Sequence, residues 1–170
     1  MSRAVLLWLA LVLPAAASAQ PVDAPYVPTP PAIVTAMLTI ARVGPDDVVY
    51  DLGSGDGRIV IAAAREFGAR GVGIERNPRL IEAAREAAAR AGIGARVRFV
   101  EQDFFDADLR EATVVTLYLL PTVNLKLRGK LRAELRHGTR VVSHYYAMGD
   151  WQPDFETEVD GRKIFYWVIE

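Results

Sequence analysis

Residues 48–57 of the 170-residue chain read Val-Val-Tyr-Asp-Leu-Gly-Ser-Gly-Asp-Gly. The apolar and β-branched run that ends at Leu52 predicts a buried strand, and it passes directly into a glycine-rich turn. Beyond the turn, apolar residues recur at helical spacing as far as Phe67, and Gly68 follows as a stop signal. A strand, a glycine-rich turn and a helix in this order expose backbone N–H groups and the positive end of a helix dipole. The stretch therefore predicts a nucleotide-type binding site.

Two classes of ligand use such a turn, and spacing and charge separate them. Dinucleotide-binding turns follow the pattern Gly-x-Gly-x-x-Gly, but here Arg58 stands where that pattern places its last glycine. The carboxylates of Asp51 and Asp56 would repel a pyrophosphate, whereas they would attract a ligand that carries an amine and a sulfonium. We therefore expect S-adenosylmethionine rather than NAD. Its expected binding residues in this stretch are Asp51, Gly53, Ser54, Gly55 and Gly57.

The alternation of strands and helices continues along the chain. Apolar runs predict strands at residues 47–52, 71–75, 97–100, 113–120 and 140–145. Helical patterns begin at Ala32 and recur between these strands, and Gly68, Gly92 and Gly138 mark the ends of three helices. At the C-terminus, residues 155–159 and 163–169 flank Asp160-Gly161, a strong hairpin signal. Strands that alternate with helices and end in a hairpin predict an α/β, doubly wound sheet in a single compact domain.

Composition excludes several classes of function. The chain carries 20 basic and 21 acidic residues, so no excess of positive charge indicates nucleic acid or an anionic membrane as a partner. It contains no cysteine, which excludes zinc–thiolate sites, Fe–S clusters and a cysteine nucleophile. Metal-dependent O-methylation would need acids that converge on a cation, and no obvious set stands in the sequence. We therefore expect no metal.

The N-terminal residues differ in character from the rest of the chain. Arg3 is followed by an apolar run and by Ala17-Ser18-Ala19, so residues 1–19 are predicted to be a signal peptide. A short membrane anchor that is never cleaved is the alternative. Residues 20–31 contain five prolines and predict an extended lead-in, which leaves residues 32–170 for the cofactor-binding domain. The signal predicts export to the periplasm or the medium, or membrane association, although S-adenosylmethionine is made in the cytosol.

Two acidic residues at strand ends suit the remaining parts of the cofactor. Glu75 ends the second predicted strand, where a carboxylate can accept hydrogen bonds from both ribose hydroxyls; a solvated glutamate is the alternative. Asp103 follows the third strand and can accept from the adenine amino group, while its neighbour Phe104 packs on the adenine ring. Because aspartate favours turns in any case, Asp103 as a plain turn residue is the alternative.

These features together resemble the seven-strand, class I methyltransferases. Within them, the sequence is similar to the branch that contains the lysine methyltransferases of the ATP synthase c subunit and the adenine nucleotide translocase. The likeness to the branch rests on YVPTP (26–30), GIERNP (73–78), YLLP (118–121) and SH (143–144). The resemblance implies a Rossmann-like sheet of seven strands in the order 3-2-1-4-5-7-6, with strand 7 antiparallel. It also implies that residues 26–30 fold over the methionine end of the cofactor, where Thr29 could bond the carboxylate.

The acceptor is expected at the carboxyl ends of the fourth and fifth predicted strands. Methyltransferases of nucleobase or glutamine amines carry a polar Asn/Asp-Pro-Pro-aromatic motif after strand four, and this chain has Tyr118-Leu119-Leu120-Pro121 instead. Such an apolar tip suits the aliphatic stem of a lysine, and burial there favours the neutral, nucleophilic amine. Tyr118 and His144 are therefore the candidate catalytic residues. Core packing of residues 118–120 and a structural role for His144 are the alternatives.

The sequence thus predicts an S-adenosylmethionine-dependent methyltransferase that N-methylates a lysine of a protein, and the resemblance points to a membrane protein as that partner. Two alternatives stay open. One is a methyltransferase that acts on a small molecule, and the other is a cofactor-binding scaffold without transfer activity.

Overall fold

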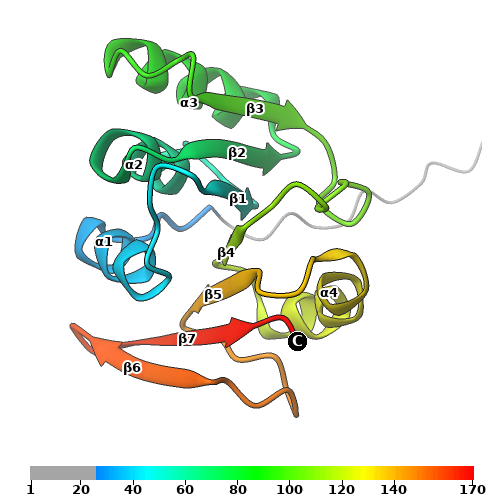
Figure 1. Cartoon of the computed structure of the whole chain (residues 1–170). Coiled ribbons are helices and arrows are strands. Elements are labelled where there is room, and N and C mark those ends of the chain that lie inside the picture. Colours follow the sequence, from blue (N-terminus) through cyan, green and yellow to red (C-terminus); the bar gives the residue numbers. More distant parts are fainter. Residues whose placement is uncertain (1–25) are drawn as a thin grey trace, which may run out of the picture.

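The computed structural model describes residues 26–170 (Figure 1). The predicted signal peptide at residues 1–19 and the lead-in up to residue 25 lie outside the described residues. The described chain alternates strands and helices as far as β5 and then ends in a hairpin, as the sequence predicts. Its elements are α1 (Pro31–Ile40), β1 (Val48–Leu52), α2 (Arg58–Phe67), β2 (Arg70–Glu75), α3 (Pro78–Arg90), β3 (Val97–Glu101), β4 (Val114–Leu117), α4 (Pro121–Glu134), β5 (Arg140–His144), β6 (Phe155–Val159) and β7 (Arg162–Val168).

All seven strands belong to one sheet, in the order β3-β2-β1-β4-β5-β7-β6. The strands β1 to β5 are parallel to one another, whereas β7 is antiparallel to both β5 and β6. Both the doubly wound α/β class and the strand order implied by the resemblance are confirmed. Figure 1 shows α1, α2 and α3 on one side of the sheet and α4 on the other. The connection between β5 and β6, residues 145–154, contains no helix, so this version of the fold is compact.

Local signals in the sequence set the ends of the helices. Gly57 precedes α2 with φ of 77° and Gly68 follows it with φ of 73°, a conformation that other residues rarely adopt. The side chain of Asn77 accepts a hydrogen bond from the Arg79 backbone at the start of α3, and Pro78 occupies its first turn. Among residues 26–170 the longest helix is α4, with 14 residues, and no helix there is long and apolar enough to cross a membrane.

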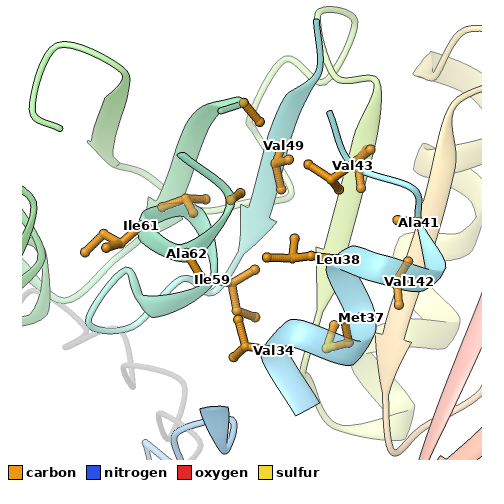
Figure 2. Close-up of a cluster of buried hydrophobic side chains, with 14 of the residues drawn as sticks. Val34, Met37, Leu38, Ala41, Val43, Val49, Ile59, Ile61, Ala62 and Val142 are labelled. Carbon is orange, nitrogen blue, oxygen red and sulfur yellow. The ribbon is translucent and has the colours of Figure 1, made fainter. Parts of the chain in front are cut away.

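On one face of the sheet, α1 closes the hydrophobic core. Its residues Val34, Met37 and Leu38 belong to a cluster that also contains Val49 of β1 and Val142 of β5 (Figure 2). Met37 and Leu38 are completely buried, and burial of such a side chain stabilises the fold by about 1.5–3 kcal/mol. By packing against these strands, α1 anchors the preceding residues at the carboxyl edge of the sheet.

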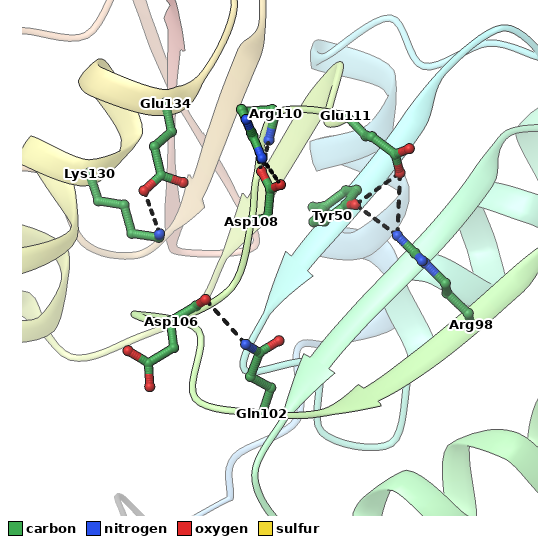
Figure 3. A network of polar contacts seen from close by, with 9 residues as sticks. All are labelled: Tyr50, Arg98, Gln102, Asp106, Asp108, Arg110, Glu111, Lys130 and Glu134. Atoms are coloured by element: carbon green, nitrogen blue, oxygen red, sulfur yellow. Dashed lines mark hydrogen bonds and ion pairs between the residues drawn. The ribbon is translucent and has the colours of Figure 1, made fainter.

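On the other face, α4 shares the covering of the sheet with the long connection between β3 and β4. Leu127 and Leu131 of α4 are fully buried, and Leu109 of the connection belongs to the same cluster. Polar contacts hold the connection in place, since the Tyr50 hydroxyl donates to the Glu111 carboxylate at 3.4 Å (Figure 3). This face is therefore closed, and it carries few of the residues predicted for the site.

The alternation of side chains along the strands gathers polar groups at one edge. On β1, Val49 belongs to the core beneath α1 and α2, so Asp51 points to the same face two residues later. Asp51 is paired with Thr116 in the register of β1 and β4. On β5, His144 follows Val142 by the same step. The polar residues thus stand at the carboxyl ends of the strands, where open α/β sheets bind ligands.

The predicted fourth strand is too long. It was expected over residues 113–120, but β4 ends at Leu117, and the residues after it leave the sheet. The reason is Pro121, which occupies the first turn of α4 and holds Leu120 in an extended conformation with ψ of 150°. The helix that follows also ends early, at Glu134 rather than at Gly138. Tyr118 is consequently half-buried at the tip of the strand rather than enclosed in the core.

At the opposite edge, Asp47 joins the start of β1 to β4 and β5. Its carboxylate accepts hydrogen bonds from the Thr113 hydroxyl at 2.6 Å and from the Gly44 backbone at 2.8 Å, and it pairs with Arg140. Arg140 in turn donates to the backbone oxygen of Ala41, which follows α1. Burial would raise the pKa of Asp47, but these bonds outweigh it and hold the pKa below its usual value.

We expect Asp47→Asn to lower the free energy of unfolding at pH 7 by about 1.5–3 kcal/mol, because a charge-assisted bond to a largely buried guanidinium is lost. The folded-state pKa of Asp47 is depressed, so this stabilisation is present above the unfolded value of 3.8 and disappears as the pH falls further. Urea unfolding at pH 7 and pH 3 should therefore show a gap between variant and wild type that closes in acid. Asp108→Asn, which removes an exposed pair with Arg110, is the control and should not move the midpoint. An equal gap at both pH values would contradict the assignment.

Candidate active site

The glycine-rich turn between β1 and α2 is pinned to β2 by its backbone. The amides of Gly53 and Ser54 both donate to the Ile74 oxygen, at 2.9 and 3.0 Å, and the Gly57 amide donates to the Ser54 oxygen. The three glycines of the turn, Gly53, Gly55 and Gly57, all have positive φ. A side chain at Gly55 would strike the ring of Tyr26, since an added Cβ would lie 2.5 Å from it. The turn therefore presents bare backbone at the carboxyl edge of the sheet.

The segment before α1 packs on this turn. Arg58, the first residue of α2, donates to the backbone oxygen of Thr29 at 2.9 Å, and the Tyr26 ring lies against Gly55. The resemblance implies that residues 26–30 cover one end of the cofactor, and the observed packing brings them to the turn that is predicted to bind it.

A buried carboxylate lies directly beneath the turn. Asp51 is 3% exposed, and its carboxylate accepts a hydrogen bond of 2.7 Å from the Thr116 hydroxyl. Burial raises the pKa of Asp51 to about 7, and the charges of Glu75 and Asp56 add to the rise, while the Thr116 bond opposes it. Without a ligand, the Asp51 carboxylate is therefore partly protonated near neutral pH. A cation beside it would favour the ionised form.

Asp56 does not offer the free negative charge that the sequence suggests. Its carboxylate accepts from the Arg58 guanidinium at 2.7 and 3.0 Å. Burial would raise the pKa of Asp56, but the bonds from Arg58 and Tyr26 outweigh it and hold the pKa below its usual range. Arg58 thus neutralises Asp56, and the attraction for a cationic ligand rests on Asp51.

Glu75 has a structural task that the sequence did not reveal. One of its carboxylate oxygens accepts from the Gly55 amide at 3.0 Å, and the other accepts from the amides of Arg76 and Asn77 at 2.8 and 2.9 Å. The carboxylate therefore ties the glycine-rich turn to the end of β2. It stands at a strand end as expected, and its contact with the ribose stays a prediction.

Gly73 is a site residue that sequence reasoning missed as such. A Cβ at this position would lie 2.6 Å from the Ser54 hydroxyl and 2.7 Å from the Phe99 ring. The Ser54 hydroxyl is buried and has no hydrogen-bond partner within residues 26–170. A glycine in the middle of a predicted strand is the signal that could have indicated close approach of another segment.

Asp103 and Phe104 lie beyond the end of β3. One oxygen of Asp103 accepts from the Phe105 amide at 2.9 Å, and the other lies 3.4 Å from the Arg76 guanidinium. The first bond is that of a turn, as the alternative reading of this aspartate expects. Phe104 packs against the core on the α4 side and lies 5.0 Å from the Phe105 ring. The contacts of both residues with adenine stay a prediction.

The two candidate catalytic residues meet each other. The rings of Tyr118 and His144 are 3.9 Å apart, and the His144 Nδ1 lies 3.3 Å from the Thr29 hydroxyl. His144 is completely buried, and its Nε2 has no partner among the described residues. Burial, assisted by the charge of Arg162, lowers the pKa of His144 to about 4, so the imidazole is neutral at pH 7 and too weak a base to deprotonate an ammonium group. The hydroxyl of Thr29 contacts this imidazole, and its predicted bond to the cofactor carboxylate stays a prediction.

The chain has close counterparts among known proteins. The sequence profile of the ANTKMT methyltransferase domain matches residues 51–155. A protein-lysine N-methyltransferase of Saccharolobus islandicus is 49% identical over 150 residues, which cover 85% of this chain and 93% of that protein. The adenine nucleotide translocase lysine N-methyltransferase of Mus musculus is 43% identical over 130 residues, 76% of this chain. The chain spans 56% of the length of this mouse protein.

A similar protein has been solved with a ligand bound. The protein described as an RNA methyltransferase from Salinibacter ruber, in complex with S-adenosyl-L-homocysteine, is 55% identical to this chain. The two structures agree with a TM-score of 0.83 over 84% of this chain and 94% of that one. S-adenosylhomocysteine is what S-adenosylmethionine becomes when its methyl group leaves.

The residues present fit S-adenosylmethionine, which is the cofactor of this chain. The glycine-rich turn offers bare backbone, and a side chain at Gly53 or Gly57 would collide with neighbouring side chains at 2.5–2.9 Å. Asp51 is a buried acid without a cationic partner among the described residues, and Ser54 keeps an unpaired buried hydroxyl. Within residues 26–170 no three His, Asp or Glu side chains gather as a metal site would need.

Because Asp51 is half protonated near pH 7 without a ligand, cofactor binding should release a proton below that pH. The cationic ammonium and sulfonium favour the ionised carboxylate, so affinity should rise by up to about tenfold per pH unit towards pH 7 and level off above it. Titration calorimetry between pH 5.5 and 8.5, in buffers of different ionisation enthalpy, measures both effects.

Asp51→Asn is the matched variant for this experiment. It should bind the cofactor more weakly and lose the proton release, while any titration of the ligand itself remains in both proteins. A wild-type affinity that follows the same pH profile as that of Asp51→Asn would show that Asp51 does not sense the cofactor.

Proposed function

The chain belongs to the ANTKMT methyltransferase family and is an S-adenosylmethionine-dependent methyltransferase, and on this premise we propose that it N-methylates a lysine side chain of a protein. The observation that carries the proposal is the apolar, aromatic tip of β4, where Tyr118 stacks on a neutral His144 and no amide-gripping motif stands.

Two relatives support this acceptor. The Saccharolobus islandicus protein is named a protein-lysine N-methyltransferase, and this chain covers nearly its whole length. The mouse protein is named for the lysine methylation of the adenine nucleotide translocase, although this chain spans about half of it. We further propose, from the resemblance to the branch of lysine methyltransferases that act on the ATP synthase c subunit and the adenine nucleotide translocase, that the acceptor protein is membrane-associated.

The residues at the tip of β4 supply what a lysine requires. When bound, S-adenosylmethionine supplies an electrophilic methyl group on a sulfonium. Leu119 lies against the glycine-rich turn, since an added Cβ at Gly53 would be 2.9 Å from it, and Tyr118 precedes it at the open edge. These side chains exclude water from the aliphatic stem, and a dry environment lowers the pKa of a lysine amine.

His144 acts as a positioning residue in this proposal. Its pKa of about 4 keeps the imidazole neutral, so it does not repel an incoming ammonium. The contact with Thr29 and the stack on Tyr118 fix the plane of the ring. Catalysis then rests on orientation and desolvation, without a strong general base.

RNA is the competing acceptor, because the Salinibacter ruber protein is described as an RNA methyltransferase. Proteins that bind nucleic acids use an excess of Lys and Arg to neutralise phosphates. This chain has a formal net charge of −1, and several acidic side chains stand after β3, among them Asp103, Asp106 and Asp108. The charge distribution therefore favours a protein acceptor.

We propose that residues 1–19 direct the enzyme to or across a membrane, either as a cleaved signal peptide or as an anchor. The proposal rests on Arg3, the apolar run after it and the small residues at 17–19. An anchor that leaves the catalytic domain in the cytosol would keep it beside its supply of S-adenosylmethionine.

A protein spanning residues 20–170 should transfer labelled methyl groups to a lysine of a membrane-associated protein in extracts from cells that lack the gene. Tyr118→Ala should lose the transfer but keep cofactor binding, because it removes the ring at the acceptor side only. Tyr118→Phe keeps the ring and should retain both. Peptide mapping identifies the labelled residue, and calorimetry measures cofactor binding.

Each other result of this labelling experiment identifies a different function. Label on RNA, on a small molecule, or on glutamine or arginine peptides would contradict lysine methylation. Cofactor binding without transfer to any fraction would indicate a scaffold. Transfer that Tyr118→Ala leaves intact would move the acceptor away from the tip of β4.

If the signal is cleaved, the protein isolated from its native cells should begin at Gln20. Intact-mass analysis and N-terminal sequencing of the membrane, soluble and exported fractions provide the measurement. Retention of Met1 or Ser2 in the membrane fraction would contradict cleavage and favour the anchor.

A further inference from the structure

A hollow of about 380 Å³ opens at the carboxyl edge of the sheet. Three segments line it: the tip of β4, the start of the connection after β5, and the turn between β6 and β7. The turn reaches this edge because β7 is antiparallel to β5, so that Ile164 pairs with His144 at the end of β5. The lining residues are Tyr118, Tyr145, Tyr146, Asp160, Gly161 and Arg162.

We infer that this hollow receives the methyl-accepting lysine side chain, with the three tyrosine rings around the stem and amine and the Asp160 carboxylate at the rim. The inference rests on the proposed lysine methylation and assigns the acceptor subsite of that activity. It makes Tyr145 and Asp160 specificity-determining residues.

The hollow lies next to the cofactor-binding turn, because neighbouring residues of the chain contact one and the other. Tyr118 lines the hollow, and the next residue, Leu119, lies against Gly53 of the turn. On the other side of Tyr118, His144 contacts Thr29, whose backbone is held by the first residue of α2. The tip of β4 therefore forms a wall shared by the hollow and the turn, as a transfer between two ligands requires.

The hollow offers aromatic faces that suit a cation. The rings of Tyr145 and Tyr146 are 5.1 Å apart and nearly perpendicular, at 73°. Tyr145 also meets His144 edge-on, with centroids 6.2 Å apart, and His144 stacks on Tyr118. A lysine ammonium is attracted to such faces by the ring quadrupole, while its aliphatic stem gains apolar contact.

The backbone at Tyr145 is strained in a way that packing does not explain. Its φ is 73°, and the Tyr146 amide donates to the His144 oxygen across it at 3.0 Å, which together describe a rare γ-turn. The ring held by this turn is 45% exposed, so it gains little from burial. The Tyr145 amide donates to the backbone oxygen of Lys163 at 2.7 Å, and the backbone oxygen of Tyr146 accepts from the Ser143 hydroxyl at 2.6 Å. Bonds on both sides thus hold the backbone of an exposed aromatic residue in place, as expected where a backbone conformation serves binding.

The charges of the β6–β7 turn are ordered from the rim inwards. Asp160 is exposed and makes no ion pair within residues 26–170, so its carboxylate is available to an arriving ammonium. Arg162 is half-buried, and its charge acts on the fully buried His144. An amine that moves inwards from Asp160 passes from a carboxylate that favours its cation to the charge of Arg162, which favours its neutral form. That order matches a substrate that arrives charged, releases its proton to solvent at the open rim, and reacts as the neutral amine.

Ring carbon signals of tyrosine in the protein bound to S-adenosylhomocysteine test the subsite directly. Addition of Nα-acetyl-lysine amide should shift the signals of Tyr118, Tyr145 and Tyr146 and leave those of Tyr50 and Tyr166 unchanged. The norleucine analogue, which keeps the stem and lacks the amine, should bind roughly 2- to 30-fold more weakly. Asp160→Asn should weaken the binding of the lysine probe alone. An absence of shifts at the three rings, or equal binding of both probes, would overturn the inference.

The variant Tyr145→Gly removes the ring and keeps the backbone conformation, so it distinguishes a role in binding from a role in stability. Glycine adopts positive φ without strain, so this variant should melt no lower than the wild type. It should nevertheless raise the KM for the acceptor protein roughly 2- to 30-fold, with cofactor affinity unchanged. Phe155→Ala is the control, because it removes an exposed aromatic ring from the end of the β6–β7 hairpin that lies away from the turn at the hollow. Unchanged acceptor kinetics in Tyr145→Gly would overturn the role of the ring.

Failure of this inference differs from failure of the proposed function. Lysine labelling by the wild type, together with full activity of Tyr145→Gly and Asp160→Asn, would leave lysine methylation standing and remove the hollow from it. Label on RNA or on a small molecule, with no response of the rings to the lysine probe, would remove both.

Discussion

A carboxylate buried at the end of β1, with one hydrogen bond from Thr116, is the contact around which the site is arranged. Removing Asp51 from water is costly, and the protein offers it no cation within the described residues. Parallel strands bring it to the edge where the glycine-rich turn, the tip of β4 and the end of β5 converge. The fold therefore keeps a buried carboxylate without a counter-ion among the described residues, and a cationic cofactor beside it offsets the free-energy cost of its burial.

The fold could be predicted from the sequence because its signals are local and periodic. The strand, the glycine-rich turn and the helix after it stand within residues 48–67, and the Asp160-Gly161 hairpin is set by the left-handed conformations of two residues. The overestimate of β4 has a local cause too. An apolar run alone cannot show where a strand ends, whereas Pro121 can, because it restricts the residue before it.

The site could be predicted only as far as it follows strand ends. Asp51, Glu75 and His144 stand at such ends, and the structure places them on one face. The partners of these residues come from segments far apart in sequence: Thr116 donates to Asp51 from 65 positions away, and Thr29 reaches His144 across 115 positions. Neither pairing has a periodic signal, because one depends on the register of β1 and β4 and the other on how the segment before α1 packs against the end of β5.

The turn between β6 and β7 is a short, self-supporting unit at the end of a hairpin. Its shape is fixed by backbone bonds and by glycine at position 161, and its side chains lie outside both core clusters. In the acceptor subsite that we infer, target preference and cofactor chemistry therefore depend on different parts of the chain. Substitutions at this solvent-exposed tip would then change the target without disturbing either core cluster, whereas side chains added in the glycine-rich turn would collide with their neighbours.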